Sequence, residues 1–359
     1  MMMRSAIGWA LLAGMSTAIA QAPAAFAAEP PAVSPSGGPV DAGAGFAFAG
    51  SKKDQDKTRR SLSGIACPAL PAGVSRLCLA VFDEGGEARL LRIGDGAIQP
   101  DPERVVLLKG EVELDGEAAA TDGEFYYVAG SHSAKRSSCK SNPDSRHLIR
   151  FALDPKTGRP VLDADGKPAA LSDTSKLWTL MGSVDGLKQH VGDRMCLGTV
   201  PPGRNGVNIE GLAVKDDRLF IGFRGPVADG GAKVLSVAKK ALFAGGPPDP
   251  QAVTLPLGAG RSVRDLVAVS DGILILAGPD DDEANDNRGF AVLHWTGKGN
   301  MLRPLARLDL SGVKLRDCDK EIKPEAIAVL AEEPGRPYEA LILSDGLCDG
   351  GALRFSIPR

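Results

Sequence analysis

Five stretches of this chain share one pattern, and this repeat constrains the fold more than any other feature of the sequence. Each copy holds a short apolar run, a turn, a second apolar run and an exit of small or charged residues. The copies are SGIACPALPAGVSRLCLAVFDEGG (63–86), GEAAATDGEFYYVAGSHS (116–133), NIEGLAVKDDRLFIGFRGP (208–226), VRDLVAVSDGILILAGPDD (263–281) and PEAIAVLAEEPGRPYEALILSDG (324–346). A third apolar run follows every copy, and a fourth follows several. Recurring groups of four short antiparallel strands predict the blades of an all-β propeller.

The number of copies predicts five blades. Residues 171–195 lie in the longest gap between copies and are predicted to form a helical insertion; if that gap hides a degenerate blade, the number is six. A β-sandwich has similar strand content, but it does not explain five hairpins of one pattern. The last copy lacks a fourth strand. The run AGFAFAG (44–50) is predicted to supply it, which closes the ring without an exposed edge.

The N-terminal part of the chain predicts export. Residues 1–28 have the charged start, apolar run and small residues of a secretory signal peptide, with cleavage after Ala28 or Ala20. An uncleaved membrane anchor is the alternative, but the apolar run is short for a bilayer span. Residues 29–45 are rich in Pro, Gly and Ala, and are predicted to be a flexible leader that packs against nothing. Residues 46–359 then form a single domain without a membrane span, in a periplasmic or secreted monomer.

Six cysteines form an even set, and export makes disulfide bonds their expected state. Because the first and second strands of a blade run antiparallel, cysteines at matching strand ends meet on one face of the disc. Two pairs satisfy this geometry, and the third pair ties the loop after the second copy to the insertion. The predicted bonds are Cys67–Cys78, Cys318–Cys348 and Cys139–Cys196.

Six short motifs carry a resemblance to a known family. In chain order they are GSHS, NIEGLA, RGP, RDL, ILILAGP and KPEAIA. Over residues 60–357 the chain resembles a bacterial family that is catalogued only as a domain of unknown function and grouped with β-propellers. It is more distantly similar to the phytase-like esterase propellers, which share acidic residues at the starts of blades. The closer resemblance implies the fold and no established activity.

Charged residues stand at the starts of first strands and the ends of second strands. In an antiparallel hairpin these ends share one edge, so the residues are expected to surround the mouth of the central channel. Ser63 takes the place of the acid in the first copy. The funnel candidates are Asp83, Glu117, His132, Glu210, Arg224, Arg264, Asp265, Glu325 and Asp345.

The charged residues at these strand ends have two interpretations. In the first, the glutamates bind neighbouring blades and Arg224 pairs with one of them, since buried charges are usually paired. In the second, the funnel holds a ligand: carboxylates bind Ca²⁺ or act as acid and base, while Arg224 and Arg264 hold an anionic group. His132 is the one histidine expected on this face. Its two possible roles are a structural hydrogen bond and catalysis.

Two loops add further hypotheses at the same face. The loop 133–147 carries four basic residues, and is either a solvated loop or a clamp for an anion. The stretch PDDDEANDNRG (279–289) offers Asp280, Asp282 and Asp286 as Ca²⁺ ligands, although it lacks the glycine and closing glutamate of an EF-hand loop.

The functional prediction is a binding platform with a charged funnel for a small anionic ligand or an envelope protein. A metal-assisted hydrolase of a phosphoester or carboxylic ester is the alternative. The chain has 42 Lys and Arg against 45 Asp and Glu, a formal net charge of −3, which gives no basic field for nucleic acid. No cofactor other than Ca²⁺ is indicated.

Overall fold

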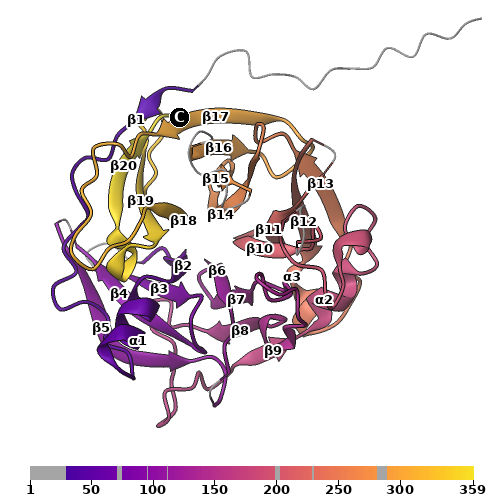
Figure 1. The fold of residues 1–359 in the computed structure, drawn as a ribbon, viewed down its shortest axis with the longest axis horizontal. Helices are drawn as coiled ribbons and strands as arrows, with labels where there is room; N and C mark the ends of the chain where they lie inside the picture. Colours follow the sequence, from indigo (N-terminus) through magenta and orange to yellow (C-terminus); the bar gives the residue numbers. More distant parts are fainter. Residues whose placement is uncertain are drawn as a thin grey trace, which may run out of the picture.

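Five antiparallel sheets surround a central channel in the computed structural model, so the propeller and the number of its blades are confirmed. The structure describes residues 30–70, 75–94, 96–110, 112–198, 203–228, 230–280 and 289–359. The predicted signal peptide and the candidate ligands Asp282 and Asp286 lie outside these residues. None of the described helices has the length and apolarity needed to cross a bilayer. Figure 1 shows the first strand of each blade nearest the axis.

Blades one to three each contain four strands in sequence order. Their strands are, in blade one, β2 (Leu62–Ala66), β3 (Arg76–Phe82), β4 (Glu87–Ile93) and β5 (Ile98–Val106); in blade two, β6 (Gly116–Thr121), β7 (Phe125–Gly130), β8 (Leu148–Ala152) and β9 (Ser172–Thr174); and in blade three, β10 (Asn208–Lys215), β11 (Arg218–Ala228), β12 (Gly231–Ala238) and β13 (Gln251–Leu255).

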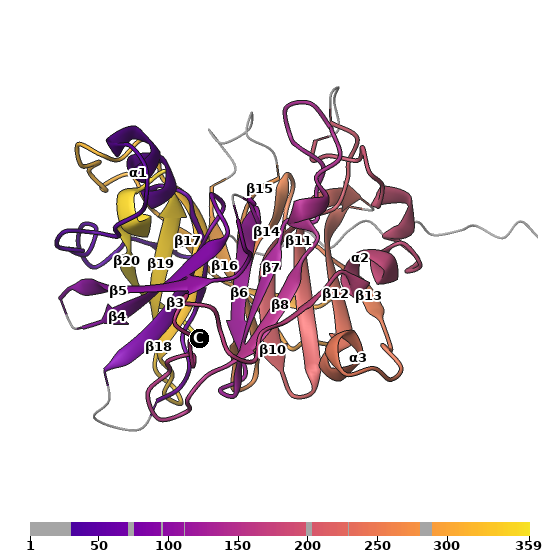
Figure 2. The same ribbon diagram turned by 90° about the horizontal axis from the view of Figure 1, so that it is seen from below.

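Blade four has a fifth, parallel strand and blade five has three strands. The strands are, in blade four, β14 (Arg261–Val269), β15 (Gly272–Pro279), β16 (Ala291–Trp295), β17 (Leu302–Leu308) and β1 (Ala32–Val33); and in blade five, β18 (Lys323–Ala331), β19 (Tyr338–Asp345) and β20 (Leu353–Ile357). The helices are α1 (Lys52–Arg59), η1 (Pro143–Ser145), α2 (Lys176–Met181), η2 (Lys188–His190), α3 (Lys239–Phe243) and η3 (Cys348–Gly351). Thus α2 and η2 confirm the helical insertion, but its predicted start is wrong, because Ser172–Thr174 forms β9 and completes blade two. Figure 2 shows α1 on one face of the disc.

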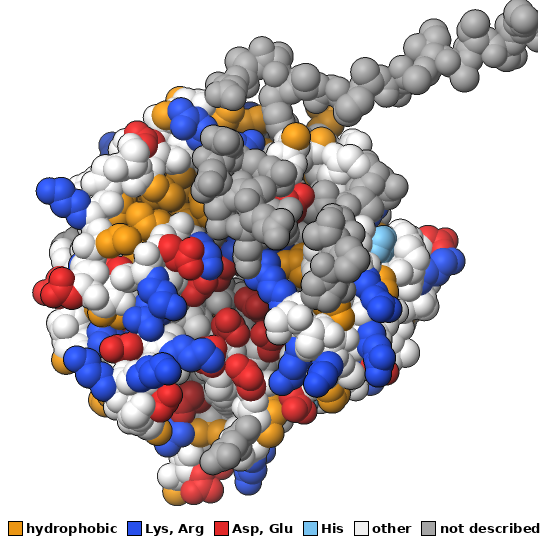
Figure 3. Space-filling model, viewed as in Figure 1, with side chains coloured by type: hydrophobic (Ala, Val, Ile, Leu, Met, Phe, Trp, Pro, Cys, Tyr) orange, Lys and Arg blue, Asp and Glu red, His pale blue; other side chains and the backbone are white. Residues whose placement is uncertain are grey.

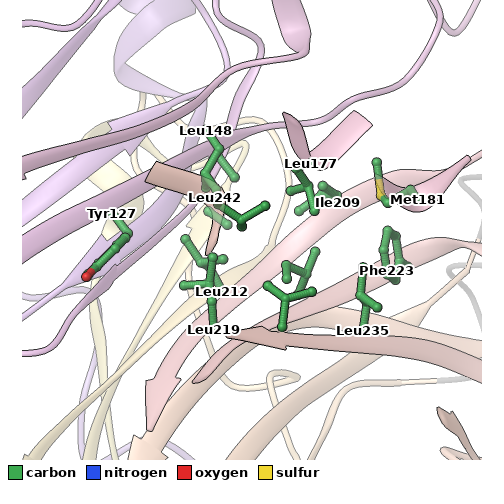
Figure 4. Packing of buried hydrophobic residues seen from close by; sticks show 14 of the residues in the cluster. Tyr127, Leu148, Leu177, Met181, Ile209, Leu212, Leu219, Phe223, Leu235 and Leu242 are labelled. Atoms are coloured by element: carbon green, nitrogen blue, oxygen red, sulfur yellow. The ribbon is translucent and has the colours of Figure 1, made fainter. Parts of the chain in front are cut away.

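Apolar side chains fill the wedge between each pair of adjacent blades, which makes five separate core clusters. Figure 4 shows the cluster between blades two and three, which includes Tyr127 and Leu148 of blade two, Ile209 and Phe223 of blade three, and Leu177 of α2. Close to the axis the first strands leave little room. A Cβ at Gly64 would lie 2.9 Å from the backbone nitrogen of Ala119 in the next blade, so a larger residue is excluded there.

Closure of the ring differs from the prediction. Residues 44–50 form no strand; instead β1 pairs in parallel with β17 of blade four. The chain then runs along the open edge of blade five, where the Ser36 and Val40 amides donate to the carbonyls of Arg354 and Ala352 at 2.9 and 2.8 Å. It ends against blade one, where the Asp41 carbonyl accepts from Ile98 at 2.9 Å.

We call residues 30–49 the N-terminal belt, because they connect blades four, five and one. The expectation that residues 29–45 pack against nothing is therefore wrong: Ala42 and Phe46 are buried in the core between blades five and one. Short, irregular backbone contacts of this kind depend on edges that are distant in the sequence, and local composition does not reveal them.

The three predicted disulfides are confirmed as Cys67–Cys78, Cys139–Cys196 and Cys318–Cys348. Disulfides are typical of proteins in oxidising compartments outside the cytoplasm. The last bond lies beside Asp349, which accepts hydrogen bonds from the Phe46 amide at 2.8 Å and from Arg59 at the end of α1. One buried carboxylate thus joins the belt, α1 and blade five.

The belt should contribute strongly to stability, and Phe46 tests this. Its ring meets Phe82 of blade one edge to face, with centroids 5.2 Å apart. Replacing a buried Phe by Ala typically costs about 3–5 kcal/mol, so Phe46→Ala should lower the free energy of unfolding by about that amount in urea denaturation. Met301, which is 84% exposed, is the control, and Met301→Ala should change it little. Equal stability of the two variants would contradict the role of the belt.

Candidate ligand-binding site

The first strand of every blade carries a β-bulge at its mouth end. In blade one Leu62 pairs with Phe82 and Gly64 pairs with Val81, so that Ser63 between them has no pairing partner on the neighbouring strand. A bulge re-aims the side chain of the extra residue and bends the strand. In the other four blades the same register shift leaves one residue of the first strand without a pairing partner. These residues are Glu117, Glu210, Arg264 and Glu325. We call these five residues the bulge ring; they are the equivalent positions at which the sequence repeat places charges.

On one side of the mouth the charges neutralise one another. Arg224 Nη1 lies 3.0 Å from Glu210 Oε1, and Arg264 Nε lies 3.0 Å from Glu210 Oε2. The other end of the Arg264 guanidinium contacts Glu325 Oε1, and Ser63 Oγ donates to Glu325 Oε2 at 3.3 Å. All four charged side chains are buried. The network therefore joins blades three, four and five, and reaches blade one through Ser63.

Two of the funnel candidates, Asp265 and His132, make structural contacts and do not line the mouth. Asp265 accepts hydrogen bonds from the amides of Leu266 at 2.7 Å and Ile327 at 2.8 Å, which ties the inner strands of blades four and five. His132 is fully buried, and its Nδ1 lies 2.9 Å from the Gly130 carbonyl. Burial lowers the pKa of His132 to about 4, so the imidazole is neutral at physiological pH.

On the other side of the mouth, beside blades one to three, lies a cavity of about 540 Å³. Figure 3 shows acidic side chains gathered in this hollow at the centre of the face, with Lys and Arg around it. Its size is within the range of small-molecule sites. The charged and amide residues that line it are Asp83, Glu84, Glu113, Asp115, Glu117, Lys135, Arg136, Asn142, Asn208, Glu210 and Arg224.

The acidic wall of the cavity holds five carboxyl groups close together, and all but the exposed Glu113 are partly buried. Its residues are Asp83, Glu84, Glu113, Asp115 and Glu117. Burial raises the pKa of Asp83 well above its usual range, and the neighbouring Asp115 raises it further. Burial, followed by Glu210 and Asp83, has the same effect on the pKa of Glu117. The pKa of Glu113 is raised by burial and by Glu84. Removing charges from water and placing like charges together both favour the protonated form.

Two side chains of this cavity lack a polar partner among the described residues. The Glu117 carboxylate, a member of the bulge ring, has no hydrogen bond or ion pair there, whereas Glu210 and Glu325 are both paired with arginine. The amide oxygen of Asn208 is likewise unpartnered within that part of the chain, although the residue is only 7% exposed. An acceptor as buried as the Asn208 oxygen is rarely without a donor in native proteins, and the partly buried Glu117 carboxylate lines the same cavity. Both groups therefore indicate a place for a ligand.

The structure adds residues that the sequence reasoning missed. Asp115 accepts a hydrogen bond from Ser131 and lines the cavity with Glu113, but neither was a candidate. Both stand in VELDGE, an acidic run directly before the first strand of blade two, and this run was the available signal. Asp345 lies at the mouth and pairs with Lys323 at 3.5 Å. Asp280 is described at the end of β15, but its two proposed partners are not.

This fold and mouth define a class: a five-bladed β-propeller with a bulge ring of charges and a one-sided acidic cavity. Within that class the chain belongs to the family described as protein of unknown function DUF3616, whose model matches residues 161–349. The resemblance to the uncharacterised propeller family is thereby confirmed. No match was found among curated proteins, and the resemblance to phytase-like propellers has no support from the comparisons.

Solved structures with a similar arrangement are distant in sequence. The GH43 endo-arabinanase from Bacillus licheniformis is 9% identical, with a TM-score of 0.37 over 84% of this chain and 94% of that one. GH43B of the Bacteroides ovatus xyloglucan PUL is 10% identical, with a TM-score of 0.41 over 84% and 52%. The extracellular domain of a hybrid two component system from B. thetaiotaomicron is 12% identical, with a TM-score of 0.30 over 82% and 27%. The chain thus spans only part of two of these proteins, and no function is taken from them.

The ion network predicts a ranking of two substitutions. Arg264→Ala leaves two buried carboxylates short of a cation, whereas Arg224→Ala affects Glu210, which keeps Arg264. Removing one partner of a buried ion pair typically costs about 3–5 kcal/mol, and stranding a single acceptor costs about 1–3 kcal/mol. Urea denaturation should give a larger loss for Arg264→Ala. Arg336→Ala, which removes an exposed ion pair with Glu333, should change the free energy of unfolding little. A larger loss for Arg224→Ala than for Arg264→Ala would contradict the network.

The acidic wall predicts an unusual pH dependence of stability. Because the pKa of Glu117 is raised in the folded state, its stabilising contribution is complete below the unfolded value and is lost as pH rises through the folded value. The free energy of unfolding of the wild type should therefore fall as pH rises from the usual pKa of a glutamate, about 4.3, into the alkaline range, relative to Glu117→Gln, which cannot ionise. Urea denaturation across this range measures the difference. A difference that does not change with pH would show that Glu117 titrates normally.

Proposed function

We propose that this protein is an exported ligand-binding propeller whose cavity holds a cationic group. The observation that carries the proposal is the unpartnered Glu117 carboxylate, placed by a bulge in a wall of carboxyl groups and accompanied by the orphaned amide oxygen of Asn208. These two groups, which have no partner among the described residues, are both acceptors. A cation or a strong hydrogen-bond donor would therefore relieve both the repulsion and the missing hydrogen bond.

The same geometry argues against an anion at the two arginines. Arg224 and Arg264 are both in contact with carboxylates and are buried. An anion placed there would have to displace Glu210 or Glu325, and either displaced carboxylate would then lack its counter-ion. The interpretation of Arg224 as a structural partner of Glu210 is thus the better supported one.

A divalent metal ion fits one part of the acidic wall. One carboxylate oxygen from each of Asp83, Glu84 and Glu113 lies within 4.8 Å of the others. Since Ca²⁺–oxygen distances are about 2.3–2.6 Å, two oxygens on one ion are at most about 5 Å apart. Ca²⁺ is therefore one source of the positive charge, and an organic ammonium group is another.

Metal-assisted hydrolysis is a second candidate function at this cavity. The observation that favours it is the pair of partly buried carboxyl groups of Asp83 and Asp115, whose pKa values are raised by desolvation. Carboxyl groups with a raised pKa are suited to proton transfer near neutral pH. A bound Ca²⁺ would polarise the ester, and one of these groups would move the proton.

Binding of the two cation sources can be tested by thermal melts at low ionic strength with CaCl₂ and with cadaverine. Either probe should raise the melting temperature of the wild type, because a ligand that binds the folded state stabilises it in proportion to its concentration over Kd. Glu117→Gln should weaken the shift. The control is Glu124→Gln, an exposed carboxylate on a turn of the same blade. No shift with either probe would refute the proposal; hydrolysis of 4-nitrophenyl acetate that depends on Ca²⁺ would support the second candidate.

A further inference from the structure

Besides Arg224, which pairs with Glu210, two basic residues of one loop line the acidic cavity, and the fold fixes this loop. Lys135 and Arg136 line the cavity together with the acidic wall. The loop turns tightly, because the amides of Cys139 and Lys135 donate to the carbonyls of Lys135 and Lys140 at 2.7 and 2.8 Å. The Cys139–Cys196 disulfide ties it to the insertion. Lys135 is thus an exposed side chain on a backbone held at the rim of the cavity.

The other basic residues of this loop have different surroundings. Arg146 lies over the ring of Trp178 at 3.9 Å and pairs with Asp193 at 2.7 Å, so that it anchors the loop to the insertion. Lys140 is exposed and is not among the residues that line the cavity. The loop therefore divides into an anchor, a pair at the cavity and an outward lysine. The Lys135 side chain has no ion pair within the described residues.

The geometry points to a zwitterionic ligand, a small molecule that carries both an ammonium group and a carboxylate. This inference rests on the proposed function and extends it, because it assigns the ammonium group to Glu117 and Asn208 and the carboxylate to Lys135. A ligand with positive charge alone would bring a cation close to the Lys135 side chain. A ligand with negative charge alone would meet five carboxyl groups of the wall. Only a ligand with both charges complements the whole cavity.

Burial and size support this assignment. The amide oxygen of Asn208 is buried and unpartnered in the described part of the chain, and an ammonium group has three N–H donors for it and for Glu117. The cavity of about 540 Å³ has room for an amino acid or a short peptide. Lysine contributes a point charge on a flexible stem, and so suits a carboxylate whose position varies among ligands.

Isothermal titration calorimetry with L-lysine and cadaverine tests the inference, because these molecules differ in the carboxylate and otherwise share one skeleton. The wild-type protein should bind L-lysine about tenfold more tightly than cadaverine, the effect of one modest charged contact. Lys135→Gln should remove this difference and leave cadaverine binding at its original strength or stronger. Lys140→Gln, in the same loop, should preserve the difference. Circular dichroism of each variant checks that it is folded.

Three results would overturn the inference. Cadaverine that binds as tightly as L-lysine would show that the carboxylate makes no contact. An unchanged difference in Lys135→Gln would place the carboxylate elsewhere. Binding of Ca²⁺ with no binding of L-lysine would refute the zwitterionic ligand but not the cation site. If Ca²⁺, cadaverine and L-lysine all fail to bind, the proposed function itself is refuted.

Discussion

The guanidinium group of Arg264 is the contact on which the mouth of this propeller depends. It lies between Glu210 of blade three and Glu325 of blade five, while the next residue, Asp265, binds the backbone of blade five. Propeller blades otherwise meet through apolar wedges, which are non-directional. A buried ion pair is a poor source of net stability, but it has a defined geometry. The arginine therefore fixes the relative positions of three blades where their inner strands emerge.

This arrangement also explains why the mouth is one-sided. Glutamates occupy three positions of the bulge ring, and one arginine satisfies two of them, which leaves Glu117 without a counter-ion among the described residues. The acidic residues just before blade two then accumulate on the unpaired side. Fold and site are thus connected by one asymmetry: on one side Arg264 pairs with two glutamates of the bulge ring, and on the other side Glu117 lines an open cavity. A ligand that supplies charge would complete the ring.

Much of this could be predicted from the sequence, and the reasons for success and failure are physical. The repeat reports local periodicity, so it predicted the five blades, the edge shared by Glu210 and Arg224, and the three disulfides. Pairing across blades depends on distances between segments far apart in the chain, so the sequence did not show that Arg264 binds two glutamates. The acids before blade two were missed because the repeat was taken to begin with the strand. The contacts of the belt were missed for a similar reason, since Ala32–Val33 pairs with a strand near the other end of the chain.

The N-terminal belt has a consequence for the order of assembly. Its partners are β17, the open edge of β20 and the start of β5, so a segment that precedes all five blades in the chain binds strands of the last two blades. It cannot dock until blades four and five have formed. Contacts between such distant segments slow folding, because a long loop must close before they gain any free energy. The belt therefore acts as a clasp that is fastened only after the C-terminal blades are in place.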